Sequence, residues 1–179
     1  MEAADVLDFW FNELNPRDWF QRNDEVDARI TSRFAALHRA AALGELWSWR
    51  SSAAGALAEI IVLDQFSRNI YRNDARAFAT DGMALVLAQE AVRRALDREL
   101  SAPQKSFMYM PFMHSESPVV HEAAVKLFSQ PGLEENLPFE LQHRDIISRF
   151  GRYPHRNEIL RRASTPAEID FLKTAPAFG

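Results

Sequence analysis

The sequence contains no cysteine, and only six of its 179 residues are glycine. The absence of cysteine excludes a disulfide framework, a thiolate zinc site and a cysteine nucleophile. The few glycines form neither a Walker loop nor a dinucleotide-binding pattern, and no His-Glu-x-x-His or Gly-x-Ser-x-Gly motif occurs. The common signatures of nucleotide-binding, metalloprotease and serine-hydrolase sites are therefore missing.

Long apolar runs and an excess of positive charge are also missing. No apolar run approaches the roughly 20 residues that span a bilayer, and the start, MEAADVLDFW, lacks the basic residues and apolar run of a signal peptide. We therefore expect a cytoplasmic protein that does not enter a membrane. The formal net charge of −4 argues against a nucleic-acid partner, because neutralising phosphates along a groove requires surplus Lys and Arg.

Signals for β-structure are scarce, whereas apolar residues recur at helical spacing. No segment alternates apolar and polar residues for long, and no Asn-Gly or Asp-Gly pair separates two apolar runs. Capping boxes begin at Ser101 and Thr165, and Gly44 and Gly151 are suited to end helices. We predict a single all-α domain over residues 1–179, with seven to nine helices packed as antiparallel or orthogonal pairs and no sheet.

The stretch from Ala56 to Asp81 is the centre of this predicted fold. It is apolar on almost every side when read as a helix, yet a set of polar residues shares one arc: Asp64, Gln65, Arg68, Asn69 and Arg72. Charges on a core-facing stripe must be paired or must open onto a wet cavity. Two interpretations follow: a fully bonded network that fixes helix packing, or a polar site inside a helical protein.

A second polar segment lies at a junction between two predicted helices, Pro111 to Ser117. His114 and Glu116 stand where side chains from one helix end and the next helix start can converge. Glu116 also lies beside an N-terminal helix dipole, which favours its charged form. A local turn stabilised by serine and glutamate is the alternative interpretation.

The densest polar segment begins at His143, which lies on an apolar helix face where a histidine is most often a satisfied core residue. Between His143 and Arg162, arginines far outnumber the two acidic residues Asp145 and Glu158: Arg144, Arg149, Arg152, Arg156, Arg161 and Arg162. A solvated basic face is one interpretation. An anion-binding pocket that includes His155 and Asn157 is the other, because guanidinium groups suit carboxylate and phosphate.

The polar segments also carry a resemblance to a known family. The chain resembles the bacterial family of domain of unknown function 924 in five blocks that follow in the same order: LDQFSRNIYR, DARAFATD, PFMHSES, HRDIISRFGRYPHRNEILRR and STPAE. The likeness runs almost end to end, with Tyr153 where the family pattern usually has phenylalanine. The resemblance implies an all-α fold similar to tetratricopeptide-repeat proteins and a superhelix of that kind, and it implies no activity, substrate or cofactor.

Three hypotheses about function remain open. The first is a pocket that binds a small anionic molecule or an acidic peptide end without a metal or cofactor, lined by Asp64, Arg68, Asn69, Arg72, His114, Glu116, His143, Arg149, Arg152, His155, Arg156 and Asn157. The second is a protein-interaction scaffold, by analogy with the tetratricopeptide architecture. The third is a hydrolase or transferase, acid–base or metal-dependent, that uses His114, Glu116, His143, Asp145 and Asp64. The nearby arginines disfavour a bare cation.

Overall fold

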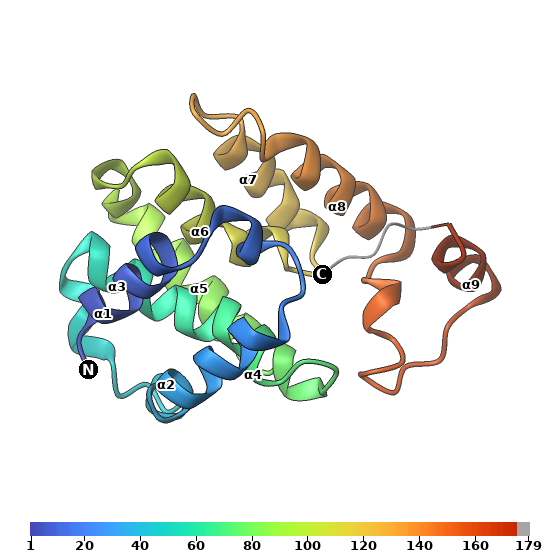
Figure 1. The fold of residues 1–179 in the computed structure, drawn as a ribbon. Helices are drawn as coiled ribbons and strands as arrows, with labels where there is room; N and C mark the ends of the chain where they lie inside the picture. The colour runs from blue at the N-terminus through green and yellow to red at the C-terminus, as the bar shows by residue number, and fades with distance from the viewer. Residues whose placement is uncertain (175–179) are drawn as a thin grey trace.

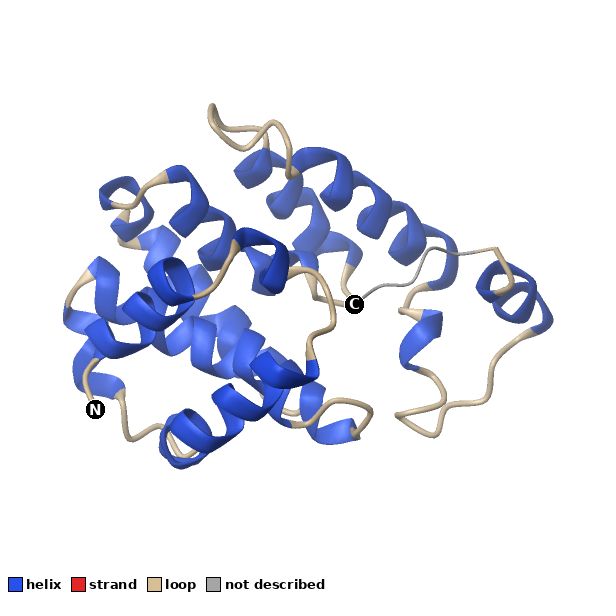
Figure 2. Ribbon diagram, viewed as in Figure 1, coloured by secondary structure: helices blue, strands red, loops and turns tan. Residues whose placement is uncertain are grey.

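The computed structural model describes residues 1–174, and this part of the chain is helical without any strand (Figure 2). The all-α prediction is confirmed. The α-helices are α1 (Ala3–Asp8), α2 (Asp24–Ala42), α3 (Ala53–Ile61), α4 (Ser67–Ile70), α5 (Asp81–Arg93), α6 (Ala102–Met113), α7 (Pro118–Phe128), α8 (Leu137–Phe150) and α9 (Pro166–Leu172). Short 3-10 turns and two π-turns connect or extend them: η1 (Phe9–Glu13), η2 (Pro16–Trp19), η3 (Trp47–Ser51), η4 (Val62–Phe66), η5 (Ala75–Phe78), η6 (Leu96–Glu99) and η7 (Pro154–Arg156).

The ends of several helices follow from local sequence. The predicted capping boxes are present at both Ser101 and Thr165, where each side chain faces the third backbone amide of its helix. Gly44 follows α2 with φ of 76°, and Gly151 ends α8 with φ of 68°. These left-handed conformations suit glycine because it has no Cβ.

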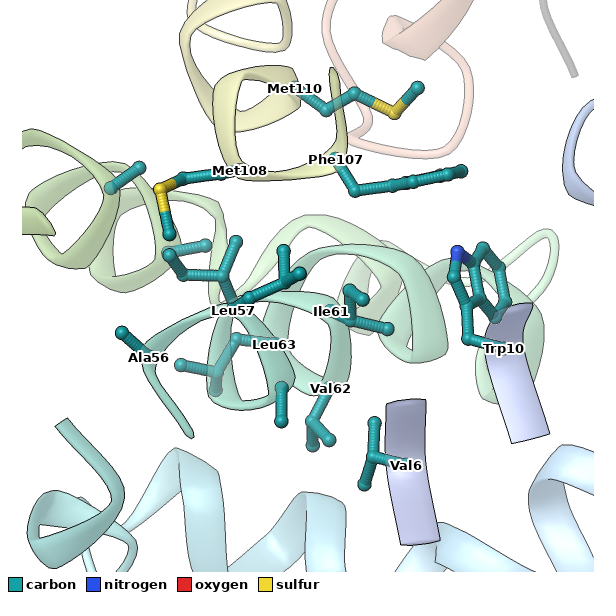
Figure 3. Close-up of a cluster of buried hydrophobic side chains, with 14 of the residues drawn as sticks. Val6, Trp10, Ala56, Leu57, Ile61, Val62, Leu63, Phe107, Met108 and Met110 are labelled. Carbon is teal, nitrogen blue, oxygen red and sulfur yellow. The ribbon is translucent and has the colours of Figure 1, made fainter. Parts of the chain in front are cut away.

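Helix α3, the π-turn η4 and α4 form one continuous helical segment through the middle of the fold (Figure 1). Helices α1, α5 and α6 pack against α3, and α2 packs against η4 and α4. Figure 3 shows Leu57 and Ile61 of α3 with Phe107 and Met108 of α6 on one side and Val6 of α1 on the other. The near-continuous apolar surface of α3 is thus covered all round, as its sequence requires.

The second half of the fold is a succession of packed helices. Helix α6 packs against α7, and α7 packs against α8, with short connections between them. After α8, the segment 151–165 carries η7 and leads to α9, which lies apart from the α1–α6 bundle (Figure 1). A small apolar cluster joins this end to α8, with Ile146, Ile147 and Tyr153 buried and Phe150 and Phe171 beside them. Within residues 1–174, no helix combines the length and apolarity required to cross a membrane.

Candidate functional site

Asp64 lies on the π-turn η4 and is fully buried. Its Oδ1 is 2.7 Å from Nδ1 of His114 and 3.2 Å from a guanidinium nitrogen of Arg68, while its Oδ2 accepts a hydrogen bond from Gln65. Arg68 also donates to the main-chain oxygen of Asp64 at 2.8 Å. The charges that the sequence places on a core-facing stripe are therefore paired. Such π-turns occur frequently at functional sites.

Asp81, the first residue of α5, accepts hydrogen bonds from two arginines. Arg68 donates to both of its carboxylate oxygens, at 2.9 and 3.1 Å. Arg156 of η7 donates to Oδ2 at 3.2 Å and to the main-chain oxygen of His114 at 3.1 Å. The guanidinium groups of Arg68 and Arg156 also lie over the ring of Phe78, at 5.6 and 4.6 Å from its centroid. We call the resulting assembly the Arg–His cluster: Asp64, Arg68, Asp81, His114 and Arg156.

The Arg–His cluster is mostly enclosed, and its less buried side chains keep only a small exposed fraction. The side chains of Arg68 and His114 are each 17% exposed and that of Asp81 is 18% exposed, whereas Arg156 is 8% exposed. Two arginines balance two aspartates, so the net charge of the cluster depends on the protonation state of His114. At this depth, ion pairs compensate for the cost of removing charges from water only when the groups are also well hydrogen-bonded.

The electrostatic environment disfavours further positive charge. Burial alone would raise the pKa of Asp64, but the charges of Arg68 and His114 and the hydrogen bonds from His114 and Gln65 hold it below its usual range. Burial and then the charge of Arg68 lower the pKa of both His114 and Arg156. Each of these basic groups is thus less readily charged than in water, and a negative ligand would offset the effect.

Glu116 anchors the segment 151–165 beside the cluster. Its carboxylate accepts two hydrogen bonds from Arg162, at 2.7 and 2.9 Å, and one from the backbone amide of Tyr153 at 2.7 Å. Asn157 accepts from Arg162 at 3.0 Å and donates to Ser164 at 3.0 Å. Glu116 therefore fixes the backbone that carries Arg156.

His143 and His155 flank the same region through Tyr153. Their ring centroids lie 5.7 and 5.4 Å from the tyrosine ring. Burial, opposed by a hydrogen bond to the Phe139 backbone, lowers the pKa of His143 to about 4. Burial and then the charge of Arg156 lower the pKa of His155 to about 3. Both histidines are consequently neutral near neutral pH.

The remaining residues of the predicted set lie elsewhere. Asn69 and Arg72 face α2, where both donate to Asp27 at 2.8 and 2.9 Å. Arg152 pairs with Glu168 of α9 at 2.6 and 2.8 Å. Arg149 is exposed and stacks on Phe150, and Asp145 is exposed beside Arg144. A surface hollow of about 420 Å³ lies against Arg149, Phe150, Arg152, Thr165, Ala167 and Glu168, and not against Asp64.

Sequence reasoning missed several polar residues of this region. Asp81 is not among the predicted site residues, although its place in the DARAFATD block was an available signal. His121 of α7 and Glu140 of α8 form a fully buried pair, with Nδ1 and Oε1 2.7 Å apart. Both fall in ordinary helical register, so no pattern distinguished them. Among residues 1–174, no group of three or more His, Asp or Glu side chains is arranged to hold a metal ion.

Comparisons with known proteins identify the family. Residues 6–176 match the family described as bacterial protein of unknown function (DUF924). A solved structure of a protein of unknown function, ATU0120 from Agrobacterium tumefaciens, is similar with a TM-score of 0.92, 41% sequence identity and 97% of each chain covered. No curated protein matches. The chain belongs to the DUF924 family.

Proposed function

We propose that this protein binds a small anionic ligand, with a carboxylate or phosphate group, at the Arg–His cluster. The observation that carries the proposal is the meeting of Arg68 and Arg156 at one carboxylate, that of Asp81. Two guanidinium groups that approach each other this closely repel unless negative charge lies between them. They also present several planar N–H donors, which suit the oxygens of carboxylate and phosphate.

The donors of Arg156 are not all used. Its Nη atoms donate to Asp81 and to the His114 backbone, whereas its buried Nε has no hydrogen-bond partner within residues 1–174. A buried donor without a partner is costly. An anion that draws the guanidinium toward itself would supply an acceptor.

The lowered pKa values of the basic groups also support the proposal, because they show an environment that disfavours positive charge. Burial is the largest cause at His114, His155 and Arg156, and a neighbouring arginine charge adds to it at each. An anion nearby favours the protonated form of each group. Binding energy therefore comes from relieving repulsion as well as from direct hydrogen bonds.

Asp81 sets the limit on affinity, because it already occupies part of the space between the two arginines. A ligand must either displace its carboxylate or bind beside His114, whose side chain is partly exposed. We therefore expect modest affinity for a bare inorganic anion and tighter binding when the anion carries further groups.

The test is thermal unfolding with phosphate, sulfate and succinate against chloride at equal ionic strength. At ten times its Kd, a ligand of the native state adds about 1.4 kcal/mol of stability. Arg156→Gln should lose the anion-specific increase in Tm. Arg72→Gln is the matched control, because Arg72 pairs with Asp27 outside the cluster. An equal increase in both variants would indicate a general salt effect and contradict the proposal.

A further inference from the structure

The structure contains two histidine–carboxylate pairs near each other, and they differ in the surroundings of the histidine Nε2 atom. In His114–Asp64 and in His121–Glu140, the Nδ1 atom lies 2.7 Å from a buried carboxylate oxygen. An ionised carboxylate can only accept a hydrogen bond, so Nδ1 of each ring carries a hydrogen. The role of each histidine then depends on what surrounds its Nε2.

Nε2 of His121 is enclosed. It lies 2.9 Å from the main-chain oxygen of Ser115 and 3.2 Å from the hydroxyl of Tyr153, and the side chain is fully buried. The residues around it leave no room for a ligand atom. The His121–Glu140 pair therefore ties α7 to α8 and to the end of α6.

Nε2 of His114 is different. It has no hydrogen-bond partner anywhere in the described chain, residues 1–174, and the side chain is 17% exposed. With the hydrogen held on Nδ1 by Asp64, the lone pair of Nε2 is available to accept a proton. Asp64 is itself fixed by Arg68 and Gln65, so the ring has one preferred orientation.

We propose that His114 is a general base, which takes a proton from a water molecule or hydroxyl group beside the bound anion. The O–H bond breaks, its electron pair remains on oxygen, and the proton forms an N–H bond at Nε2. The imidazolium that results is stabilised by the carboxylate of Asp64, which acts as a positioning residue. The ligand class is an anion that carries or adjoins a hydroxyl group; this part rests on the proposed function, whereas the basicity of His114 does not.

Burial and the charge of Arg68 lower the pKa of His114 and so favour the neutral ring, the form that can accept a proton. Asp64 and Arg68 face it from the central helical segment and Asp81 from α5. His143 of α8 and His155 of η7 are near enough for their charges to interact with that of His114, and Arg156 of η7 donates to its main-chain oxygen. Burial and the charge of Arg68 outweigh the attraction of the two aspartates, so the pKa of His114 lies below its ordinary value.

The experiment is modification of the full chain with diethyl pyrocarbonate between pH 5 and 8, with peptide mapping by mass spectrometry. We expect His114 to react at least 10-fold faster than His121, along a pH profile whose midpoint lies below that of free histidine. The comparison is internal to one native protein and needs no variant. Equal rates for the two histidines would overturn the proposal.

Asp64→Asn tests the positioning role. Removing the negative charge should lower the pKa of His114 further and move the midpoint of the profile to lower pH. Asp27→Asn is the matched control, because Asp27 is also an arginine-bonded carboxylate but lies at α2, outside the cluster; its profile should equal that of the wild type. A profile unchanged in a folded Asp64→Asn variant contradicts the inference.

A second measurement covers the case in which Asp64→Asn does not fold. Nitrogen-15 NMR of the wild-type histidine rings at pH 8 should find the hydrogen of His114 on Nδ1, and the opposite tautomer overturns the proposal.

Inorganic phosphate distinguishes the failure of the general-base proposal from the failure of the anion-site proposal. If phosphate raises Tm but His114 is unreactive, the general-base role of His114 is contradicted and the proposed anion site is supported. If His114 is reactive but phosphate neither stabilises the protein nor slows the modification, the proposed anion site is contradicted and the general-base role of His114 is supported.

Discussion

Arg156 and Asp81 form an ion pair, with Nη1 3.2 Å from Oδ2, that joins the segment after α8 to the start of α5. Because Arg68 bonds the same carboxylate, this pair connects the central helical segment to the last third of the chain. A mutation at any one of these three residues should therefore affect the other two.

Arg156→Ala should destabilise the fold by about 2–4 kcal/mol, because it removes a mostly buried partner of Asp81 and the stacking on Phe78 and Tyr153. The cost is limited because Arg68 still pairs with Asp81. Chemical denaturation measures the change. Arg149→Ala is the control, since Arg149 is exposed and should cost less than about 0.5 kcal/mol. Equal costs for the two variants would show that Arg156 contributes no more than a surface arginine.

The ion pairs at Asp81 should be energetically coupled. In a double-mutant cycle with Asp81→Ala and Arg156→Ala, the double variant should be more stable than the sum of the single effects by at least about 1 kcal/mol. The reason is that each single variant leaves a partly buried charge with fewer partners. The cycle Asp27→Ala with Arg156→Ala joins residues of separate clusters and should be additive within about 0.5 kcal/mol. Additivity in both cycles would contradict the shared network.

Stability should fall as the pH is lowered from 7 toward 4. His143 and His155 have folded-state pKa values of about 4 and about 3, below the ordinary histidine value. Between the unfolded and folded pKa values the unfolded chain binds more protons, so acid favours unfolding. This effect begins near pH 6.5 and levels off below about pH 3. Denaturation curves at pH 7, 5.5 and 4.5 measure it.

The control for this pH dependence is the double variant His143→Gln with His155→Gln. It should show a smaller loss of stability between pH 7 and 4.5 than the wild type, because its two side chains do not titrate. A loss of the same size in both proteins would show that the two histidines do not cause the pH dependence.

Glu116→Gln should loosen the segment 151–165. The substitution removes the charge that two nitrogens of Arg162 bond and weakens the acceptor for the Tyr153 amide. Amide hydrogen exchange should become faster from Gly151 to Thr165 and remain unchanged in α3, whose side chains are almost all buried. Faster exchange throughout the chain would mean that Glu116 supports the whole fold and not this segment.

Much of the fold could be predicted from the sequence because the signals are local. The capping boxes at Ser101 and Thr165 and the glycines after α2 and α8 act within a few residues of themselves. The π-turn η4 could not be predicted in this way. It arises where the central segment meets helices on all sides, so tertiary packing and not local preference decides it.

The polar cluster could be predicted only in part. Pairing of Asp64 with Arg68 follows from their spacing of four residues on a core-facing stripe. Their partners Asp81 and Arg156 depend on how α5 and η7 approach the central segment, which no local pattern specifies. Arg72 shares the predicted arc with Arg68, but it donates to Asp27 of α2 and therefore lies outside the cluster.

The central claim is that an anion binds where Arg68, His114 and Arg156 meet. The most direct measurement is a phosphate titration of the nitrogen-15 labelled protein, followed by NMR at the arginine Nε–H groups and the histidine rings. The account predicts saturable shifts at these three residues and none at Arg72, with the shifts lost in Arg156→Gln. No saturable shift at His114 and Arg156, or shifts of equal size at Arg72, would contradict it.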